Sequence, residues 1–375
     1  MKTRIWAAAA LIALIGITTT IVAMQASAQA GASPLHVVQI ADMPFARAVH
    51  QATLLRSGEV LITGGCSGGC DAHLRSATLY KPETQAFRPA ADMATARDSH
   101  AALALADGRV LVAGGWSQRK ASHSAEIYDP QSHRFVAAGA LTVARAAPAA
   151  TRLPDGRVLM TGGVTSELEP LASAELFDPA TSSFSPTATM GVARVGHVAV
   201  ALADGRVLIV GGRQARRGAI LRSAEIFDPS TGRFQPTGEM SVPRHKHAAA
   251  LLPDGRVLVL GGSDARDQAG RYRSTEIYDP RSGKFAPGPD MGWPRFKLPH
   301  AVAVLPSGAV IVAGGAKRLE LFDPVSQTFV PLQGELSAPR EFATASLLPS
   351  GEVLVLGGYD EKIQTSASAW LVRVP

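Results

Sequence analysis

A short apolar run that ends in Gly-Gly recurs along the whole chain. It is clearest in DGRVLVAGG (107–115) and DGRVLIVGG (204–212), and the Gly-Gly pairs begin at positions 64, 114, 162, 211, 261, 314 and 357. Each run follows an Asp-Gly or Ser-Gly dipeptide. Such a dipeptide favours a tight hairpin turn, because glycine takes positive φ without a Cβ clash. The pattern therefore predicts seven repeat units, each with two antiparallel strands that precede its Gly-Gly.

A second block with alternating apolar residues follows the loop after each of the first six Gly-Gly pairs. It reads SAEIYDP at 124–130 and SAEIFDP at 223–229, and a Phe stands seven residues after its aromatic residue in every copy. These Phe residues are Phe87, Phe135, Phe184, Phe234, Phe285 and Phe329. The block predicts a strand, an Asp-Pro turn and a further strand. Each unit then has four antiparallel strands, and we expect the aromatic side chains to form core instead of a ligand site.

The two ends of the repeat array complement each other. SAWLVRV (368–374) matches a third strand, but the chain stops before a fourth, while LHVVQI (35–40) has no partner hairpin. Pairing the two would remove exposed sheet edges. We therefore predict an all-β, seven-bladed propeller closed by the N-terminal strand. Its blades span about 43–90, 91–139, 140–188, 189–238, 239–289, 290–332 and 338–375 plus strand 35–40.

The repeated motifs resemble those of a known family. R-x-x-H-x-A, DGRVLV-x-GG and AE-I-Y/F-DP are similar to the Kelch repeat, and in particular to bacterial exported Kelch proteins whose propellers resemble the central domain of galactose oxidase. The resemblance covers residues 35–375. It implies the propeller fold and leaves the activity open.

Composition and the N-terminus place the protein in its compartment. The 375 residues are 46% hydrophobic and 18% charged, which excludes disorder. Residues 1–30 have Lys2 and Arg4 ahead of an uncharged stretch and end in small residues, the order of a signal peptide. We expect cleavage and a periplasmic or secreted propeller. The alternative is that the same segment is retained as a membrane anchor.

The two cysteines stand close together. Cys66 and Cys70 lie in a CSGGC loop, and no other cysteine is present. In an oxidising compartment this spacing favours a local disulfide, with metal binding or redox use as the alternatives.

Antiparallel order assigns the loops to two faces. The loops after each Gly-Gly lie on one face, here called the upper face, and the Asp-Gly turns lie on the other. The formal charge is +6 without a Lys/Arg run of the nucleic-acid-binding type. The upper loops hold 13 Lys or Arg against 7 Asp or Glu, and RQARRGAILR (213–222) contributes four Arg. A basic upper mouth is predicted, with the turn aspartates on the lower face.

A cation stands ten residues before each turn and is predicted to ring the channel mouth. The set is Arg47, Arg97, Arg145, Arg194, Arg244, Lys297 and Arg340. These side chains could bind carboxylate or phosphate groups. Alternatively, each pairs with the Glu that opens a third strand: Glu126, Glu175, Glu225, Glu276 or Glu320. Since Thr78 and Trp370 replace that Glu in the first and last blades, Arg47 and Arg340 are the sharpest candidates for an anion site.

Histidines follow these cations at a spacing of three. His50, His100, His197, His247 and His300 occupy the position, and Pro148 and Ala343 replace them in two blades. A metal site near the axis would need several of them to converge on one ion, whereas equivalent positions on different blades stay apart. We expect hydrogen bonds between blades instead.

The galactose oxidase resemblance implies a copper ligand set of two His and two Tyr, one Tyr linked to Cys, which this chain does not reproduce. Its cysteines lie in the CSGGC loop, and Tyr80, Tyr128 and Tyr278 belong to the repeat core. Upper-loop residues outside the repeat core are the other binding candidates: Trp116, Arg213, Arg216, Arg217, Tyr272, Trp293 and Tyr359.

We therefore expect a monomeric binding module, without a cofactor or metal, for a protein or an anionic glycan. It would bind no nucleic acid and, after signal cleavage, would have no membrane span. The alternative functions are a sugar mutarotase or epimerase of the exported Kelch type and, third, a copper oxidase.

Overall fold

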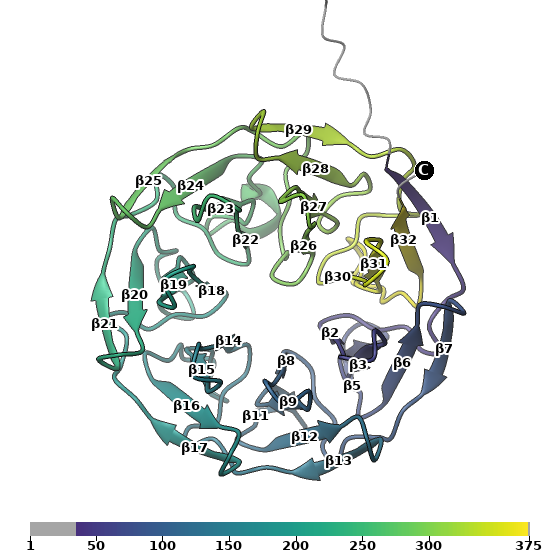
Figure 1. Ribbon diagram of the computed structural model, residues 1–375. Helices are drawn as coiled ribbons and strands as arrows, with labels where there is room; N and C mark the ends of the chain where they lie inside the picture. Colours follow the sequence, from purple (N-terminus) through teal and green to yellow (C-terminus); the bar gives the residue numbers. More distant parts are fainter. Residues whose placement is uncertain (1–34, 374–375) are drawn as a thin grey trace, which may run out of the picture. The chain divides into compact units, whose positions relative to one another are not determined.

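The computed structural model describes residues 35–373, so the predicted signal segment 1–30 lies outside the described residues. Within that range the chain forms seven four-stranded antiparallel sheets arranged around a central axis (Figure 1). The prediction of an all-β, seven-bladed propeller is confirmed. None of the helices in the described range is long and apolar enough to cross a membrane.

Each blade contributes one strand to each of four concentric positions. The innermost strands are β2 (Gln51–Leu54), β8 (Ala101–Ala104), β14 (Ala149–Arg152), β18 (Val198–Ala201), β22 (Ala248–Leu251), β26 (Val302–Val304) and β30 (Thr344–Leu347). The second strands are β3 (Val60–Thr63), β9 (Val110–Ala113), β15 (Val158–Thr161), β19 (Val207–Val210), β23 (Val257–Leu260), β27 (Val310–Val312) and β31 (Val353–Leu356). These second strands are completely buried, as their uninterrupted apolar sequence requires.

The outer half of each blade is the hairpin around the Asp-Pro turn. Its third strands are β6 (Ala77–Lys81), β12 (Ala125–Asp129), β16 (Ala174–Asp178), β20 (Ala224–Asp228), β24 (Thr275–Asp279), β28 (Glu320–Asp323) and β32 (Ala369–Arg373). The outer strands are β7 (Ala86–Pro89), β13 (Arg134–Ala137), β17 (Ser183–Pro186), β21 (Arg233–Pro236), β25 (Lys284–Pro287), β29 (Thr328–Pro331) and β1 (His36–Ile40).

Short elements occupy the upper loops. Blades 1 and 2 have small hairpins, formed by β4 (Cys66–Ser67) with β5 (Ala72–His73) and by β10 (Trp116–Ser117) with β11 (Lys120–Ala121). The loop of blade 5 contains the single-turn 3-10 helix η1 (Asp267–Gly270).

Closure occurs where the two ends of the repeat array meet. β1 pairs antiparallel with β32, from His36 opposite Arg373 to Ile40 opposite Ala369, and so supplies the outer strand of the seventh blade. Figure 1 shows the first and last strands side by side at the right of the ring. The edge of β32 is therefore covered instead of being left open for pairing with another chain.

The aromatic residues of the outer hairpins pack between blades, as predicted. In the first six blades the third-strand aromatic lies 4.8 to 5.1 Å, centroid to centroid, from the Phe of the outer strand. Tyr128, for example, is completely buried in a cluster with Leu61 and Leu79 of the preceding blade and with Met93 of the segment between the two blades. Each aromatic thus joins two sheets, and the core is a ring of apolar clusters between neighbouring blades.

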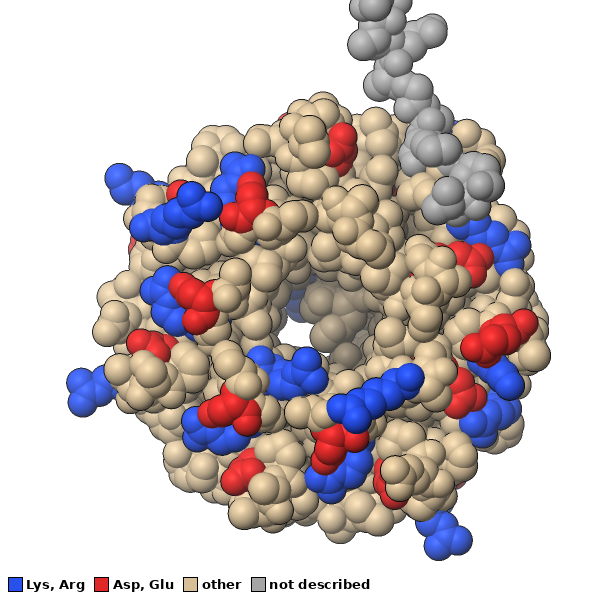
Figure 2. Space-filling model, in the orientation of Figure 1, with Lys and Arg blue, Asp and Glu red and all other residues tan. Residues whose placement is uncertain are grey.

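The lower face carries the Asp-Gly-Arg turns. In the turn at 107–109 the Arg109 guanidinium lies 2.7 Å from the Asp107 carboxylate, and the turns at 155–157, 204–206 and 254–256 repeat this pair. Figure 2 shows such paired basic and acidic side chains around a central opening. The turn aspartates lie on this face as expected, but their arginine neighbours compensate their charge.

Candidate functional site

The Gly-Gly pairs form the seam between blades. In all seven blades the second Gly donates its backbone N–H to the carbonyl oxygen of the Arg in the next blade, as in Gly65 to Arg97 at 2.9 Å and, at the closure, Gly358 to Arg47 at 3.0 Å. A Cβ on the preceding glycine would meet that neighbouring blade; at Gly162 it would lie 2.4 Å from the Arg194 oxygen. The motif therefore recurs because blade contact leaves no room for a side chain there.

The repeated arginines are buried in this seam. Arg97, Arg145, Arg194, Arg244 and Arg295 have no exposed surface, and each pairs with the Glu of its own third strand at 2.6 to 3.2 Å. The prediction that this ring of cations lines the channel mouth is wrong for the arginines, because each guanidinium points into its blade. There it also binds the carbonyl of the first Gly, as Arg145 binds Gly162 at 2.8 Å.

The Glu partner has a second task in each of these blades. Glu175 accepts the backbone N–H groups of Thr142 and Val143, which belong to the segment entering the blade, at 2.7 and 3.2 Å. Burial lowers the pKa of Arg145, and the Glu175 carboxylate opposes that shift. The arginine, the glutamate and the entry segment thus form one buried polar network.

Blade 6 corrects the sequence alignment. Arg295, and not Lys297, occupies the buried arginine position, with its guanidinium 2.7 Å from Glu320. Two additional residues lie between this arginine and the turn, so counting back from the turn selected the wrong cation. Lys297 instead lies at the upper mouth, with Nζ 2.7 Å from Glu341.

Arg47 and Arg340 lack the glutamate, as their sequences indicated, but neither is open to a ligand. Arg47 has no exposed surface and donates to the backbone carbonyls of Gly64 and Ser76. Burial lowers its pKa to about 10. Arg340 is 8% exposed and lies over the Trp370 ring at 5.7 Å. Both serve the closing seam, where a hydroxyl or an aromatic face replaces the carboxylate.

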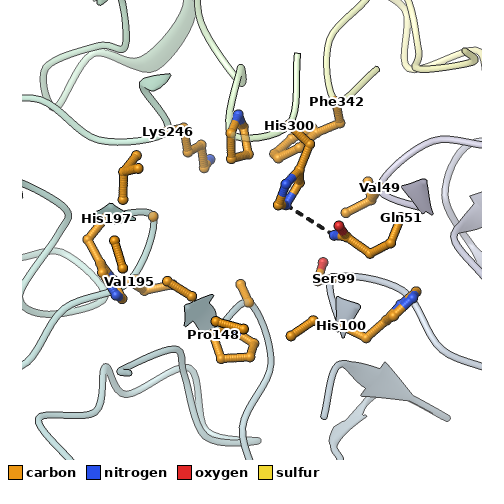
Figure 3. Close-up of a pocket in the computed structure, with 18 of the residues that line it drawn as sticks. Val49, Gln51, Ser99, His100, Pro148, Val195, His197, Lys246, His300 and Phe342 are labelled. Carbon is orange, nitrogen blue, oxygen red and sulfur yellow. Dashed lines mark hydrogen bonds between the residues drawn. The ribbon is translucent and has the colours of Figure 1, made fainter. Parts of the chain in front are cut away.

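Most of the histidines that recur three residues after the repeated cation form hydrogen bonds between blades. His100 Nε2 lies 2.9 Å from Thr63 Oγ1, and His197 Nε2 lies 2.9 Å from Thr161 Oγ1 of the preceding blade. Burial lowers the pKa of His197 to about 3. His247 is buried in the same place, but neither of its ring nitrogens has a hydrogen-bond partner among the described residues. In blade 6, Leu298 takes the expected place of the histidine. His300 instead reaches the channel, where its Nε2 accepts from Gln51 at 3.1 Å (Figure 3). In the described part of the chain, no group of three or more His, Cys, Asp and Glu is placed to hold a metal ion.

The residue two positions after each buried arginine forms the upper mouth. All seven have positive φ, between 49° and 66°: Val49, Ser99, Ala147, Gly196, Lys246, Lys297 and Phe342. Backbone hydrogen bonds link these residues from blade to blade, as in Ala147 to Ser99 at 2.8 Å and Lys246 to Gly196 at 2.7 Å. This position varies between blades while its neighbours repeat. That variation is the sequence signal by which a channel-facing residue could have been found.

Beneath this ring lies a cavity of about 890 Å³ on the axis. Its wall is largely apolar and includes small residues of five innermost strands: Ala52, Ala102, Ala150, Ala249 and Ala345. Figure 3 shows Gln51, Ser99, Lys246 and His300 projecting toward the open centre. A concave, mostly apolar volume with a few polar groups is the usual form of a small-ligand site.

The charged side chains of this cavity gather on one side. Among the residues that line it, Lys and Arg are represented by Arg213, Arg216 and Lys246, and Asp and Glu by Asp267 alone. All four come from blades 4 and 5. Asp267 Oδ1 lies 3.8 Å from the Arg213 guanidinium and 4.0 Å from Lys246 Nζ. This wall therefore holds three cations against one carboxylate and is positive.

The blade 5 loop reaches across the mouth. Gln268, in η1, donates to Glu341 of blade 7 at 2.6 Å, and the other oxygen of Glu341 binds Lys297. The loop of blade 6 is short, with only residues 316–319 between its glycines and its third strand, so it does not obstruct this contact. The blade 5 loop thus holds Asp267 over the cavity, beside His245 and Lys246.

The loop residues predicted to bind a ligand divide into two groups. Trp116, Arg213 and Arg216 line the cavity. Arg217, Tyr272, Trp293 and Tyr359 do not belong to its wall; Tyr272 instead packs on Arg244, and Tyr359 is buried against Phe342. Lys246, Asp267 and His300 complete the site and were not predicted to bind a ligand.

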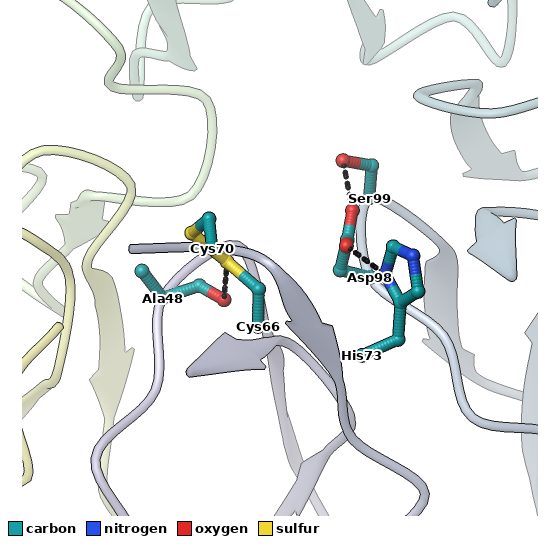
Figure 4. Close-up of a disulfide and its surroundings, with 6 residues drawn as sticks. All are labelled: Ala48, Cys66, Cys70, His73, Asp98 and Ser99. Atoms are coloured by element: carbon teal, nitrogen blue, oxygen red, sulfur yellow. Dashed lines mark hydrogen bonds and ion pairs between the residues drawn. A yellow bond between two sulfur atoms is a disulfide. The ribbon is translucent and has the colours of Figure 1, made fainter. Parts of the chain in front are cut away.

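The cysteines lie on the upper side of blade 1. Cys66 and Cys70 form a disulfide, and Cys66 Sγ is also 3.6 Å from the Ala48 carbonyl oxygen (Figure 4). Beside it, Asp98 accepts from His73 Nδ1 at 2.6 Å and from Ser99 Oγ at 2.8 Å. The disulfide thus closes a loop that packs against the ring of mouth residues at Val49 and Phe342.

Comparison with known proteins identifies the repeat and the architecture. Residues 99–141, 194–241 and 244–292 match the Kelch motif. Many solved structures share the fold; one is a fungal alcohol oxidase of the AA5 family in complex with copper, with a TM-score of 0.68 and 16% sequence identity over 90% of this chain and 75% of that one. At this identity the likeness concerns the fold. No curated protein matches the sequence.

Proposed function

Three segments of this chain match the Kelch motif, and its propeller shares the fold of an alcohol oxidase of the AA5 family; we propose that it is an exported binding module for an acidic carbohydrate, which enters the cavity from the upper face. The propeller supplies a generic binding scaffold, and the cavity wall supplies the selectivity. The observation that carries the proposal is the gathering of Arg213, Arg216 and Lys246 on one side of an axial cavity of about 890 Å³.

The geometry suits a sugar acid in two respects. The cationic side can hold a carboxylate, since guanidinium groups form bidentate hydrogen bonds with that group. Trp116 and Phe342 offer aromatic surface on other blades, against which the apolar face of a sugar ring can stack. A cavity of this size and shape also suits a small ligand better than it suits the flat surface of a protein partner.

Export is supported by the order of residues 1–30 and by the use of both cysteines in a disulfide. Such bonds persist in oxidising compartments. The module acts as a monomer in this proposal, because β1 covers the edge of β32 and gives the last blade the same four strands as the others.

The test is calorimetric titration with glucuronate, with glucose as the neutral control. We expect glucuronate to bind and glucose to bind much more weakly, with the difference falling as salt concentration rises. Double substitution Arg213→Gln and Arg216→Gln should weaken glucuronate binding by at least roughly tenfold, because a charged hydrogen bond contributes about 1.5–3 kcal/mol.

Arg217→Gln is the matched control, since this arginine lies in the same loop but outside the cavity wall. It should leave the affinity within about twofold, as expected for a surface charge. Equal affinity for glucose and glucuronate, or equal effects of the control and the double substitution, would contradict the proposal. Binding of an acidic peptide in place of glucuronate would redirect it to a protein partner.

A further inference from the structure

We propose that Lys246 is a nucleophilic amine that forms an imine with a carbonyl compound carrying a carboxylate group. The carboxylate requirement rests on the proposed anion site, whereas the amine chemistry rests on the surroundings of Lys246 itself. Among the lysines in residues 35–373, Lys246 is the one that lines the cavity. Figure 3 shows its side chain directed toward the open centre.

The position of Lys246 makes its amine accessible without tying it down. Its side chain is 35% exposed, and its nearest carboxylate oxygen, Asp267 Oδ1, lies 4.0 Å from Nζ, at the limit of an ion pair. That same oxygen is 3.1 Å from His245 Nε2 and 3.8 Å from the Arg213 guanidinium. Asp267 is thus shared among three groups and compensates the charge of Lys246 only in part.

Neighbouring cations oppose protonation of the Lys246 amine. Burial against the cavity wall lowers its pKa, Asp267 and Glu341 oppose this shift, and the charges of Lys297 and Arg213 lower the pKa further. A partly buried lysine beside another cation is a recurrent arrangement for an amine that must be neutral to react.

Lys297 provides a comparison within the same structure. Both amines lie over the Phe296 ring, at 5.2 Å for Lys246 and 5.3 Å for Lys297. Lys297 Nζ, however, lies 2.7 Å from Glu341, and although burial acts against protonation, this hydrogen bond raises its pKa overall. The two amines therefore differ in reactivity although they stand side by side along the mouth.

The reaction is balanced within the site. The lone pair of the neutral Lys246 amine forms a C–N bond to the carbonyl carbon, and the C=O π electrons move to oxygen. Both protons of the nitrogen pass to that oxygen, carried by Asp267, and the oxygen leaves as water while the C=N bond forms. An amine and a carbonyl give an imine and one water, so no oxidant or reductant is consumed. Arg213 and Arg216 hold the carboxylate of the compound on the same wall as the amine.

The test is trapping with glyoxylate, an aldehyde that carries a carboxylate, in the presence of sodium cyanoborohydride. The hydride reduces the imine to a stable secondary amine, which peptide mass spectrometry locates. We expect the adduct at Lys246 to form roughly tenfold faster than at any other lysine. Ion-paired Lys297 and exposed Lys362 serve as internal controls in the same chain.

Two further arms separate this inference from the proposed function. Acetaldehyde, which lacks the carboxylate, should modify Lys246 several-fold more slowly, and Lys246→Arg should abolish the fast adduct. Modification of Lys246 no faster than Lys362 would overturn the inference, even if glucuronate binds the native protein and the proposed function stands. Equal rates with glyoxylate and acetaldehyde would overturn the carboxylate requirement and count against the anion site, while fast labelling of Lys246 would still support its nucleophilic character.

Discussion

The buried Arg145–Glu175 pair offers the sharpest test of how the seam between blades stabilises the propeller. The substitution is Glu175→Gln, which keeps the size of the side chain and removes its charge. Neither residue has exposed side-chain surface, and the Arg145 guanidinium lies 2.7 Å from Glu175 Oε1. The variant would therefore leave a cation inside the protein without a carboxylate.

The magnitude follows from the distances. At 2.7 Å and an effective dielectric constant of about 20, the attraction between the two charges is about 6 kcal/mol. Thr142 N–H binds Glu175 Oε2, whereas Val143 N–H and the Arg145 guanidinium both bind Oε1. The single carbonyl oxygen of Gln can replace only one of these two oxygens, and its amide nitrogen cannot accept a hydrogen bond in place of the other. Since removal of one partner from a buried pair commonly costs about 3–5 kcal/mol, we expect that loss in the free energy of unfolding.

The assay is urea unfolding followed by tryptophan fluorescence, with the midpoint and slope compared between variants. Glu239→Gln is the control because it makes the same chemical change in an exposed pair, in which Glu239 lies 3.4 Å from Arg222 and both side chains are more than half exposed. The control should cost less than about 1 kcal/mol. If Glu175→Gln lowers the midpoint no more than Glu239→Gln, the reasoning that the seam depends on charge compensation is refuted.

Three other outcomes test the fold. Gly162→Ala should destabilise the protein by about 2 kcal/mol or more, because its Cβ would lie 2.4 Å from the Arg194 oxygen; Gly255→Ala, which meets nothing within 4 Å, measures the cost of positive φ alone in the same urea assay. The free energy of unfolding should fall as pH drops below about 6.5, and His197 should contribute up to about 1.4 kcal/mol per pH unit to this fall. The reason is that the pKa of His197 is about 3 in the folded state, below its value in the unfolded chain, so the unfolded chain takes up the proton first. A His197→Gln variant whose stability falls as steeply with pH between pH 7 and pH 5 would count against this. Deletion of strand β1, His36–Ile40, should lower the melting temperature and cause association, detected by light scattering, since the edge of β32 is then exposed; an unchanged monomer would show that closure is dispensable.

The sequence repeats predicted the architecture because the same local chemistry is used in every blade. Turn glycines, apolar second strands and paired aromatics recur with small variation, and each motif needs only its own blade and the next to form. The pairing of each arginine with a glutamate in the same blade could also be anticipated, since both recur in step. The alignment failed in blade 6, where Leu298 and Pro299 lengthen the segment after Arg295 and the structure absorbs the extra residues before β26.

The candidate site could be predicted only in part. Arg213, Arg216 and Trp116 stood out in the upper loops, but the ring of arginines proposed for the mouth is buried. Lys246 occupies a variable position inside the repeated motif and was not singled out from the sequence. The role of Asp267 could not be predicted from the sequence, because it depends on the blade 5 loop crossing toward blade 7.

The sequence by itself determined the number of blades, the order of strands within each and the partner of the N-terminal strand, because these follow from local periodicity and from counting hairpins. Only the tertiary structure decided which charged groups face the ligand. The buried arginine and the mouth residue stand only two positions apart in the segment before each innermost strand, and a positive φ at the mouth residue directs it away from the core. Burial among neighbouring blades therefore selected Arg145 for the scaffold and left Lys246 at the mouth.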